Sequence, residues 1–193
     1  MPLSSNDEPI LAFKTAPAFE AWLAKRHAKA PGLWLRLYKK GSGKASLSYA
    51  EALDAALCYG WIDAKKDKLD ALSWVQRFCP RRPKGAWSKR NIEHVERLIK
   101  AGRLRPTGLA AVQAAKDDGR WARAYDPPSR HQVPADLLAA LDKDKKAQAF
   151  FATLNRANTY AIAYRLQTAK KPETRARRFE ALLAMLKRGE KLH

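Results

Sequence analysis

The stretch from Arg77 to Asn91 holds the densest group of side chains that could bind a ligand. Six cations and one indole fall within it, around the expected start of a helix at Ser88. Free backbone N–H groups and the helix dipole at such a start favour an anion. The alternative is that Arg and Pro shape a loop after an edge strand while the indole packs in the core. The candidates for binding a phosphate-bearing or carboxylate ligand are Arg81, Arg82, Trp87, Ser88 and Lys89.

Asp63 is the carboxylate that could act in catalysis, because it closes a Trp-Ile-Asp segment and could face a pocket lined by Trp61 and Trp74. A general base needs a raised pKa and a bound partner. Pairing of Asp63 with an arginine across the sheet explains its position equally well. An enzyme that uses Asp63 and Arg81 on a small molecule is therefore an alternative hypothesis, and no catalytic residue is assigned.

A second basic patch lies near the end of the chain, where Pro172 is expected in the first turn of a helix. Its cations could face an acidic partner, or they could form the solvated side of that helix. The patch consists of Lys170, Lys171, Arg175 and Arg178.

Residue spacing argues against a metal or a nucleotide cofactor. The four histidines are far apart in sequence, and no glycine-rich phosphate loop occurs. Arginines on both sides of Cys79 would favour its thiolate, whereas Cys58 lies in an apolar helix end and is expected to be buried. We therefore predict no metal and no cofactor.

The net charge is +19, from 38 Lys and Arg against 19 Asp and Glu in 193 residues. The excess concentrates in residues 61–105 and 165–193, and clustered cations attract polyanions. Nonspecific binding of nucleic acid is therefore a further alternative, although no nucleic-acid-binding module is recognised. Uncharged runs such as Ala55 to Ile62 are far shorter than the roughly 18 residues that a membrane span needs, so no membrane span is predicted. Without the pattern of a secretory signal, a cytoplasmic location is expected.

Alternation and helical periodicity predict an α+β fold. A small antiparallel sheet of about three strands is expected in the N-terminal half, packed with helices, and the C-terminal half is expected to be helical. The strands are predicted at Leu33–Tyr38, Trp61–Lys65 and Leu72–Cys79, with helices capped at Ser48 and Ser88. We expect an α+β domain in residues 1–125 and a helical segment in residues 126–193 that packs on it or forms one compact domain with it.

Six sequence motifs follow one another along the chain: Ala52–Asp63, Pro80–Pro83, Trp87–Lys89 with Asn91, Val95–Leu98, Gly119–Trp121 with Ala124 and Tyr125, and Ala169–Arg178. In this order, from about residue 12 onward, the chain resembles the bacteriocin-protection, YdeI or OmpD-associated family. The family usually has Thr where this chain has Cys79 and Ser where it has Gly85, which argues against a catalytic cysteine.

This resemblance implies a stress-response protein linked to resistance against antimicrobial peptides and bacteriocins. A porin partner is implied by the family name alone, and no catalytic residues come with it. Because a chain of charge +19 repels cationic peptides, protection would have to be indirect. The leading hypothesis is a non-enzymatic protein that binds an anionic ligand at a basic, aromatic surface.

Overall fold

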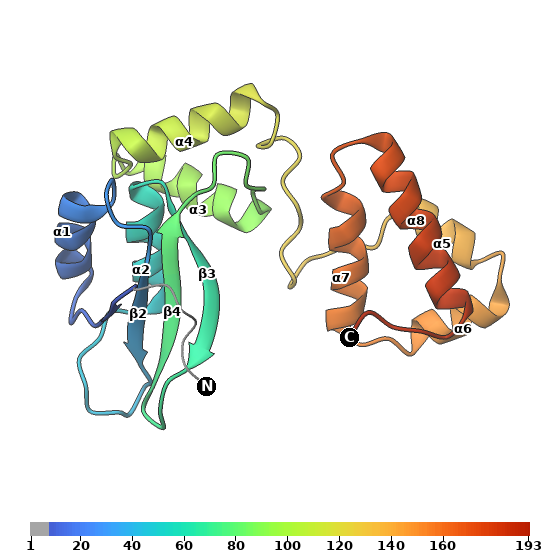
Figure 1. Cartoon of the computed structure of the whole chain (residues 1–193), viewed down its shortest axis with the longest axis horizontal. Helices are drawn as coiled ribbons and strands as arrows, with labels where there is room; N and C mark the ends of the chain where they lie inside the picture. The colour runs from blue at the N-terminus through green and yellow to red at the C-terminus, as the bar shows by residue number, and fades with distance from the viewer. Residues whose placement is uncertain (1–7) are drawn as a thin grey trace. The chain divides into compact units, whose positions relative to one another are not determined.

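The computed structural model describes residues 8–193, which divide into two compact units (Figure 1). The first unit comprises the chain up to Gly85 together with Glu93–Asp118. The second unit comprises Ala86–Ile92 and Gly119–His193. We describe each unit by itself.

The first unit contains a four-stranded sheet in the order β1-β2-β4-β3. Its strands are β1 (Ile10–Leu11), β2 (Leu33–Tyr38), β3 (Trp61–Lys68) and β4 (Ser73–Pro80). The three longer strands pair antiparallel as predicted, while β1 adds a short parallel edge beside β2. The α+β class is confirmed, with one strand more than the pattern of alternation indicated.

The β3–β4 connection is shorter than predicted. The run of Lys and Asp after Lys65 was expected to be a loop, but β3 continues to Lys68 and pairs with β4 beyond an irregularity between Asp63 and Lys66. Backbone hydrogen bonds extend the strand there although the side chains have a composition typical of loops.

Helices cover one face of this sheet. Leu33, Leu35 and Phe78 point to that face, and all three are fully buried. Helix α1 (Ala16–Arg26) brings Phe19 against Phe78, with their ring centroids 5.9 Å apart. Helix α2 (Tyr49–Cys58) packs beside α1 and behind the strands in Figure 1.

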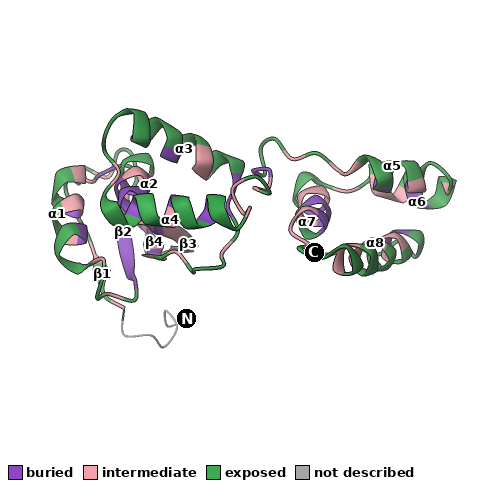
Figure 2. Cartoon of the chain, turned by 90° about the horizontal axis from the view of Figure 1, so that it is seen from above, coloured by how far each residue is buried: buried purple, intermediate pink, exposed green. Residues whose placement is uncertain are grey.

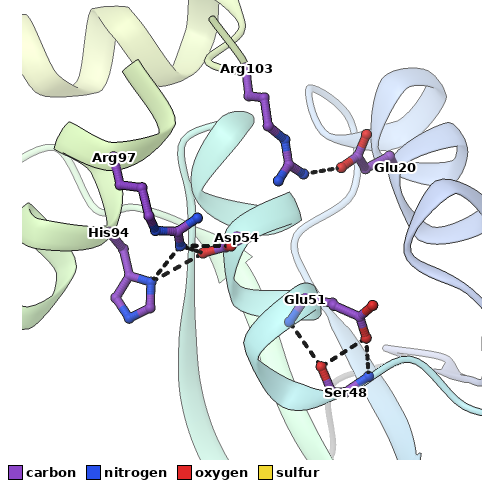
Figure 3. Close-up of polar contacts among 7 residues, drawn as sticks. All are labelled: Glu20, Ser48, Glu51, Asp54, His94, Arg97 and Arg103. Carbon is purple, nitrogen blue, oxygen red and sulfur yellow. Dashed lines mark hydrogen bonds and ion pairs between the residues drawn. The ribbon is translucent and has the colours of Figure 1, made fainter. Parts of the chain in front are cut away.

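Polar contacts tie the helices of the first unit together (Figure 3). The capping box predicted for α2 is present, with Ser48 and Glu51 bonded to each other's backbone. Asp54 of α2 accepts hydrogen bonds from Arg97 (2.7 Å) and lies 3.1 Å from His94 Nδ1, both on α3 (Lys89–Lys100). Helix α4 (Pro106–Asp117) packs against α2.

The second unit is helical over most of its length. Its helices are α5 (Ala135–Leu141), α6 (Lys145–Ala152), α7 (Arg156–Gln167) and α8 (Pro172–Lys187). They bury a core of apolar side chains, and Figure 2 colours the buried positions of these helices purple. The largest contributors are Leu137, Leu141, Ile162, Leu166, Leu182 and Leu186.

None of the helices within residues 8–193 combines the length and the apolar run needed to cross a membrane.

Candidate anion-binding site

A small hollow in the second unit is lined by three cationic side chains. Its volume is about 40 Å³. Arg120 and Arg123 approach from the turn after α4, and Lys170 approaches from the connection between α7 and α8. The remaining lining residues are Ala86, Gln167, Thr168 and Ala169. Among these described lining residues there are three cations and no carboxylate.

Gly119 leaves room for the Arg123 guanidinium to lie against the backbone of the turn. Its φ of +73° lies in the left-handed region that favours glycine. A Cβ at this position would lie only 2.6 Å from Nη1 of Arg123, and the backbone N–H of Arg123 donates to the Gly119 carbonyl (3.2 Å). A side chain at residue 119 would therefore displace the guanidinium.

The turn between α7 and α8 positions Lys170. Helix α7 ends at Gln167, and the hydroxyl of Thr168 donates to the Tyr164 carbonyl (2.6 Å). Pro172 then begins α8, so only four residues separate the two helices. This short connection keeps residues 168–170 together at the hollow.

A polar network next to the hollow joins three distant parts of the sequence. It consists of Lys89, Asp126 and Gln167 and is called the strut below. Lys89 Nζ lies 2.7 Å from Asp126 Oδ1, and Gln167 Nε2 donates to Asp126 Oδ2 (2.7 Å). The backbone N–H of Asp126 donates in return to Gln167 Oε1 (3.1 Å). Burial acts to raise the pKa of Asp126, but hydrogen bonds from Lys89 and Gln167 outweigh it and hold that pKa below its usual value.

Trp87 and Ser88 have structural roles beside this strut. Trp87 is 2% exposed, and its ring centroid lies 5.0 Å from that of Trp121. Ser88 forms a parallel bridge with Tyr125, and its hydroxyl accepts the backbone N–H of Asn91 (3.2 Å). The predicted cap at Ser88 is therefore present, and it uses the hydroxyl that was a candidate donor to an anion.

The other two members of the predicted anion site belong to the first unit. Arg81 is half-buried, and its backbone N–H donates to the Gly60 carbonyl (3.0 Å). Arg82 is exposed in the loop after β4. The five candidates are thus divided between the two units. Of these five, Lys89 is the member that forms the ion pair with Asp126.

The second predicted patch also separates into different environments. Lys170 lines the hollow, whereas Lys171 is exposed at the N-cap of α8. Arg175 Nη1 pairs with Asp136 Oδ2 (2.7 Å), and Arg178 Nη1 donates to the Arg165 carbonyl (2.7 Å).

Tyr49, which no motif singled out, contacts both Asp63 and Trp74, two of the three residues predicted to form a pocket. Tyr49 donates its hydroxyl to Asp63 Oδ2 (2.8 Å), and its ring centroid lies 6.1 Å from that of Trp74. Trp61 instead packs in the core against Trp22, with its indole N–H donated to the His27 carbonyl (3.1 Å). Burial raises the pKa of the Cys58 thiol, as expected for a buried cysteine.

In the part of the chain that the structure describes, no group of three or more His, Cys, Asp or Glu side chains could hold a metal ion.

A wider hollow of about 660 Å³ lies along α7 and is lined mainly by apolar atoms, including those of Tyr160 and Tyr164. Burial, with smaller effects of Tyr125 and Tyr164, raises the pKa of Tyr160 to about 12. The pKa of Tyr160 is higher in the folded protein than in the unfolded chain, so the neutral phenol favours folding. This contribution to the free energy of unfolding is fully present below about pH 10 and is lost as the pH rises toward 12.

Tyr160 should therefore ionise about two pH units after an ordinary tyrosine. An alkaline titration followed by phenolate absorbance should show a final step near pH 12, which Tyr160→Phe removes. Complete ionisation of all six tyrosines by about pH 10.5 in the folded protein would contradict this assignment.

Family comparisons match both halves of the chain. Residues 11–111 match the family described as a domain of unknown function (DUF8412), and residues 131–189 match the family described as bacteriocin-protection, YdeI or OmpD-associated. The resemblance drawn from the motifs is confirmed in the second range, which contains the motif Ala169–Arg178. The motifs between Ala52 and Leu98 fall within the first range, which matches a different family description, and the motif that begins at Gly119 falls between the two ranges. No curated protein and no solved structure matches the chain. Since the first match covers more than half of the 193 residues, the protein belongs to the DUF8412 family, and its residues 131–189 match the model of the bacteriocin-protection, YdeI or OmpD-associated family.

Proposed function

We propose that this protein is a non-enzymatic binding protein whose second unit holds a small oxyanion group, a phosphate or a carboxylate. The supporting observation is the convergence of Arg120, Arg123 and Lys170 on one hollow. Guanidinium groups donate planar, paired hydrogen bonds that fit carboxylate and phosphate oxygens. A lysine adds a compact positive charge to the same site.

The size of the hollow favours a single charged group. Its volume of about 40 Å³ is far below the roughly 300–1,000 Å³ of pockets that enclose a whole drug-sized ligand. Two carboxylate oxygens or the outer oxygens of a phosphate fit within this space. The rest of a larger ligand would extend outward from the hollow.

The strut around Asp126 gives the site a fixed wall. Gln167 both lines the hollow and exchanges two hydrogen bonds with Asp126, which Lys89 neutralises. Such a network holds Gln167 in one orientation before a ligand arrives, which reduces the entropy lost on binding. The family matched by residues 131–189 is named for bacteriocin protection. Because the protein's own positive charge repels cationic peptides, it would contribute to such protection by binding an anionic ligand and not by binding the peptide itself.

Phosphate should raise the thermal stability of the wild-type protein more than that of a Lys170→Gln variant. A ligand that binds only the folded state stabilises it by RT ln(1 + [L]/Kd), about 2.7 kcal/mol at a hundredfold excess over Kd. Thermal unfolding is measured at increasing phosphate concentration, with chloride keeping the ionic strength constant. Arg120→Gln combined with Arg123→Gln should reduce the phosphate response as Lys170→Gln does.

Arg177→Gln is the matched control, because Arg177 is an exposed cation on α8 outside the hollow. Phosphate also stabilises proteins generally by exclusion from their surfaces, so the informative quantity is the difference between variants. Equal phosphate responses of the wild type, Lys170→Gln and Arg177→Gln would contradict the proposed site.

A further inference from the structure

A second basic hollow lies in the first unit, at the end of the β3–β4 hairpin. Its volume is about 420 Å³, roughly ten times that of the anion site in the second unit. Three lysines and an indole line it, together with Asp67 and Ser73. The lysines are Lys39, Lys66 and Lys68, and the indole is that of Trp74.

Strand pairing places Lys66, Lys68 and the Trp74 indole on one face of the hairpin. Lys68 is the direct cross-strand partner of Trp74, and Lys66 is the partner of Gln76. Side chains paired in this way project to the same side of the sheet. Nζ of Lys66 lies 4.5 Å from the centroid of the Trp74 ring, which shows that a cation reaches the π-face of the half-buried indole.

Nearby carboxylates are paired with cations outside this group. Asp67 forms an ion pair with Lys65 (3.0 Å), and Asp70 forms one with Arg36 (2.7 Å). The charges of Lys39, Lys66 and Lys68 are therefore left in excess. An adjoining hollow of about 540 Å³ shares Lys39 and adds the cations Lys40 and Lys44, so positive charge continues along the loop after β2.

We propose that the hairpin hollow binds single-stranded nucleic acid, with one base stacked on Trp74 in place of the Lys66 ammonium, which then contacts a neighbouring phosphate together with Lys68. Proteins that bind single strands combine a basic groove with an aromatic ring that accepts any base. An indole inside a hollow can stack only with a base that is already unpaired, which favours a single strand over a duplex. This site lies in the first unit and does not depend on the anion site of the second.

The test is fluorescence anisotropy of a labelled oligothymidylate titrated with the full-length protein at low salt. Trp74→Ala should weaken binding by about 5- to 100-fold, the range expected when one base can no longer stack. Trp74→Phe should retain most of the affinity, because phenylalanine keeps an aromatic face. Lys66→Gln combined with Lys68→Gln should reduce the slope of log K against log salt by about 0.7 for each phosphate that the variant no longer neutralises.

Lys25→Gln is the control, since Lys25 is an exposed cation of the same unit on α1; its affinity should stay within about twofold of the wild type. The wild type failing to bind at low salt, or binding a duplex as tightly as the single strand, would overturn the proposal. An affinity of Trp74→Ala within twofold of the wild type would also overturn it. If Trp74→Ala does not fold, an unchanged salt slope in the double lysine variant would overturn it instead.

Discussion

Replacing Trp87 with alanine should lower the free energy of unfolding of the second unit by about 3–5 kcal/mol, the usual cost of truncating a buried tryptophan. Trp87 is 2% exposed and packs against Trp121. Its carbonyl also accepts the backbone N–H of Tyr125 (3.0 Å), so the ring fills space beside the bridge that joins residues 86–92 to the rest of the unit. The removed side chain would leave a cavity there.

Chemical denaturation followed by circular dichroism measures this destabilisation. Trp121→Phe is the comparison, because Trp121 is only half-buried and phenylalanine keeps part of the ring packing. This variant should lose clearly less free energy of unfolding than Trp87→Ala. If Trp87→Ala unfolds within about 1 kcal/mol of the wild type and instead loses phosphate binding, Trp87 is a ligand-binding residue and its structural assignment is wrong.

Gly108→Ala should destabilise the first unit, although the same substitution in an open helix is stabilising by about 0.5–1 kcal/mol. A Cβ at Gly108 would lie 2.4 Å from the carbonyl oxygen of Cys58 and 3.0 Å from that of Leu57. The backbone N–H of Arg105 donates to the same Cys58 carbonyl (3.0 Å), which fixes the start of α4 against the end of α2. The added methyl group would push α4 away from α2, which should lower the free energy of unfolding by about 1–3 kcal/mol, the usual effect of overpacking.

Ala110→Gly provides the matched control for this variant. Ala110 is an exposed residue of the same helix, so its replacement should cost only about 1 kcal/mol of helix propensity. Urea unfolding of both variants gives the comparison. A Gly108→Ala protein more stable than the wild type would show that α2 and α4 are not closely packed at this point.

Local sequence patterns predicted those elements of the fold that depend on neighbouring residues. The Ser48–Glu51 capping box and the Ser88 cap are each formed within one helical turn, and both are present. Strand β1 has only two residues and takes its pairing from β2, so no period of alternation could reveal it. The extra length of β3 likewise comes from hydrogen bonding to β4.

The candidate site depended much more on interactions between distant residues. Lys89, Asp126 and Gln167 are about 40 residues apart in sequence, yet their side chains form one network. The group Arg81, Arg82 and Lys89 was predicted because its members are close in sequence, but the structure divides them between two units. Asp126 and Gln167 were not predicted as site residues, because neither has a local pattern that distinguishes it from a linker or a helix end.

One signal in the sequence pointed to the hollow. Arg120 follows Gly119 in one motif of the family resemblance, and Lys170 lies in another. Lys170 was assigned to the second basic patch, whereas Arg120 was not predicted as a site residue. Only the fold of the second unit shows that they line the same hollow.

A phosphate titration followed by the backbone amide signals of isotope-labelled protein shows whether the hollow of the second unit binds an anion. We expect saturable shifts concentrated at Ala86, Arg120, Arg123 and residues 167–170. These shifts should disappear in Lys170→Gln but not in Arg177→Gln. Shifts that are spread over the whole surface and do not saturate, or that persist in Lys170→Gln, would contradict an anion site in the second unit.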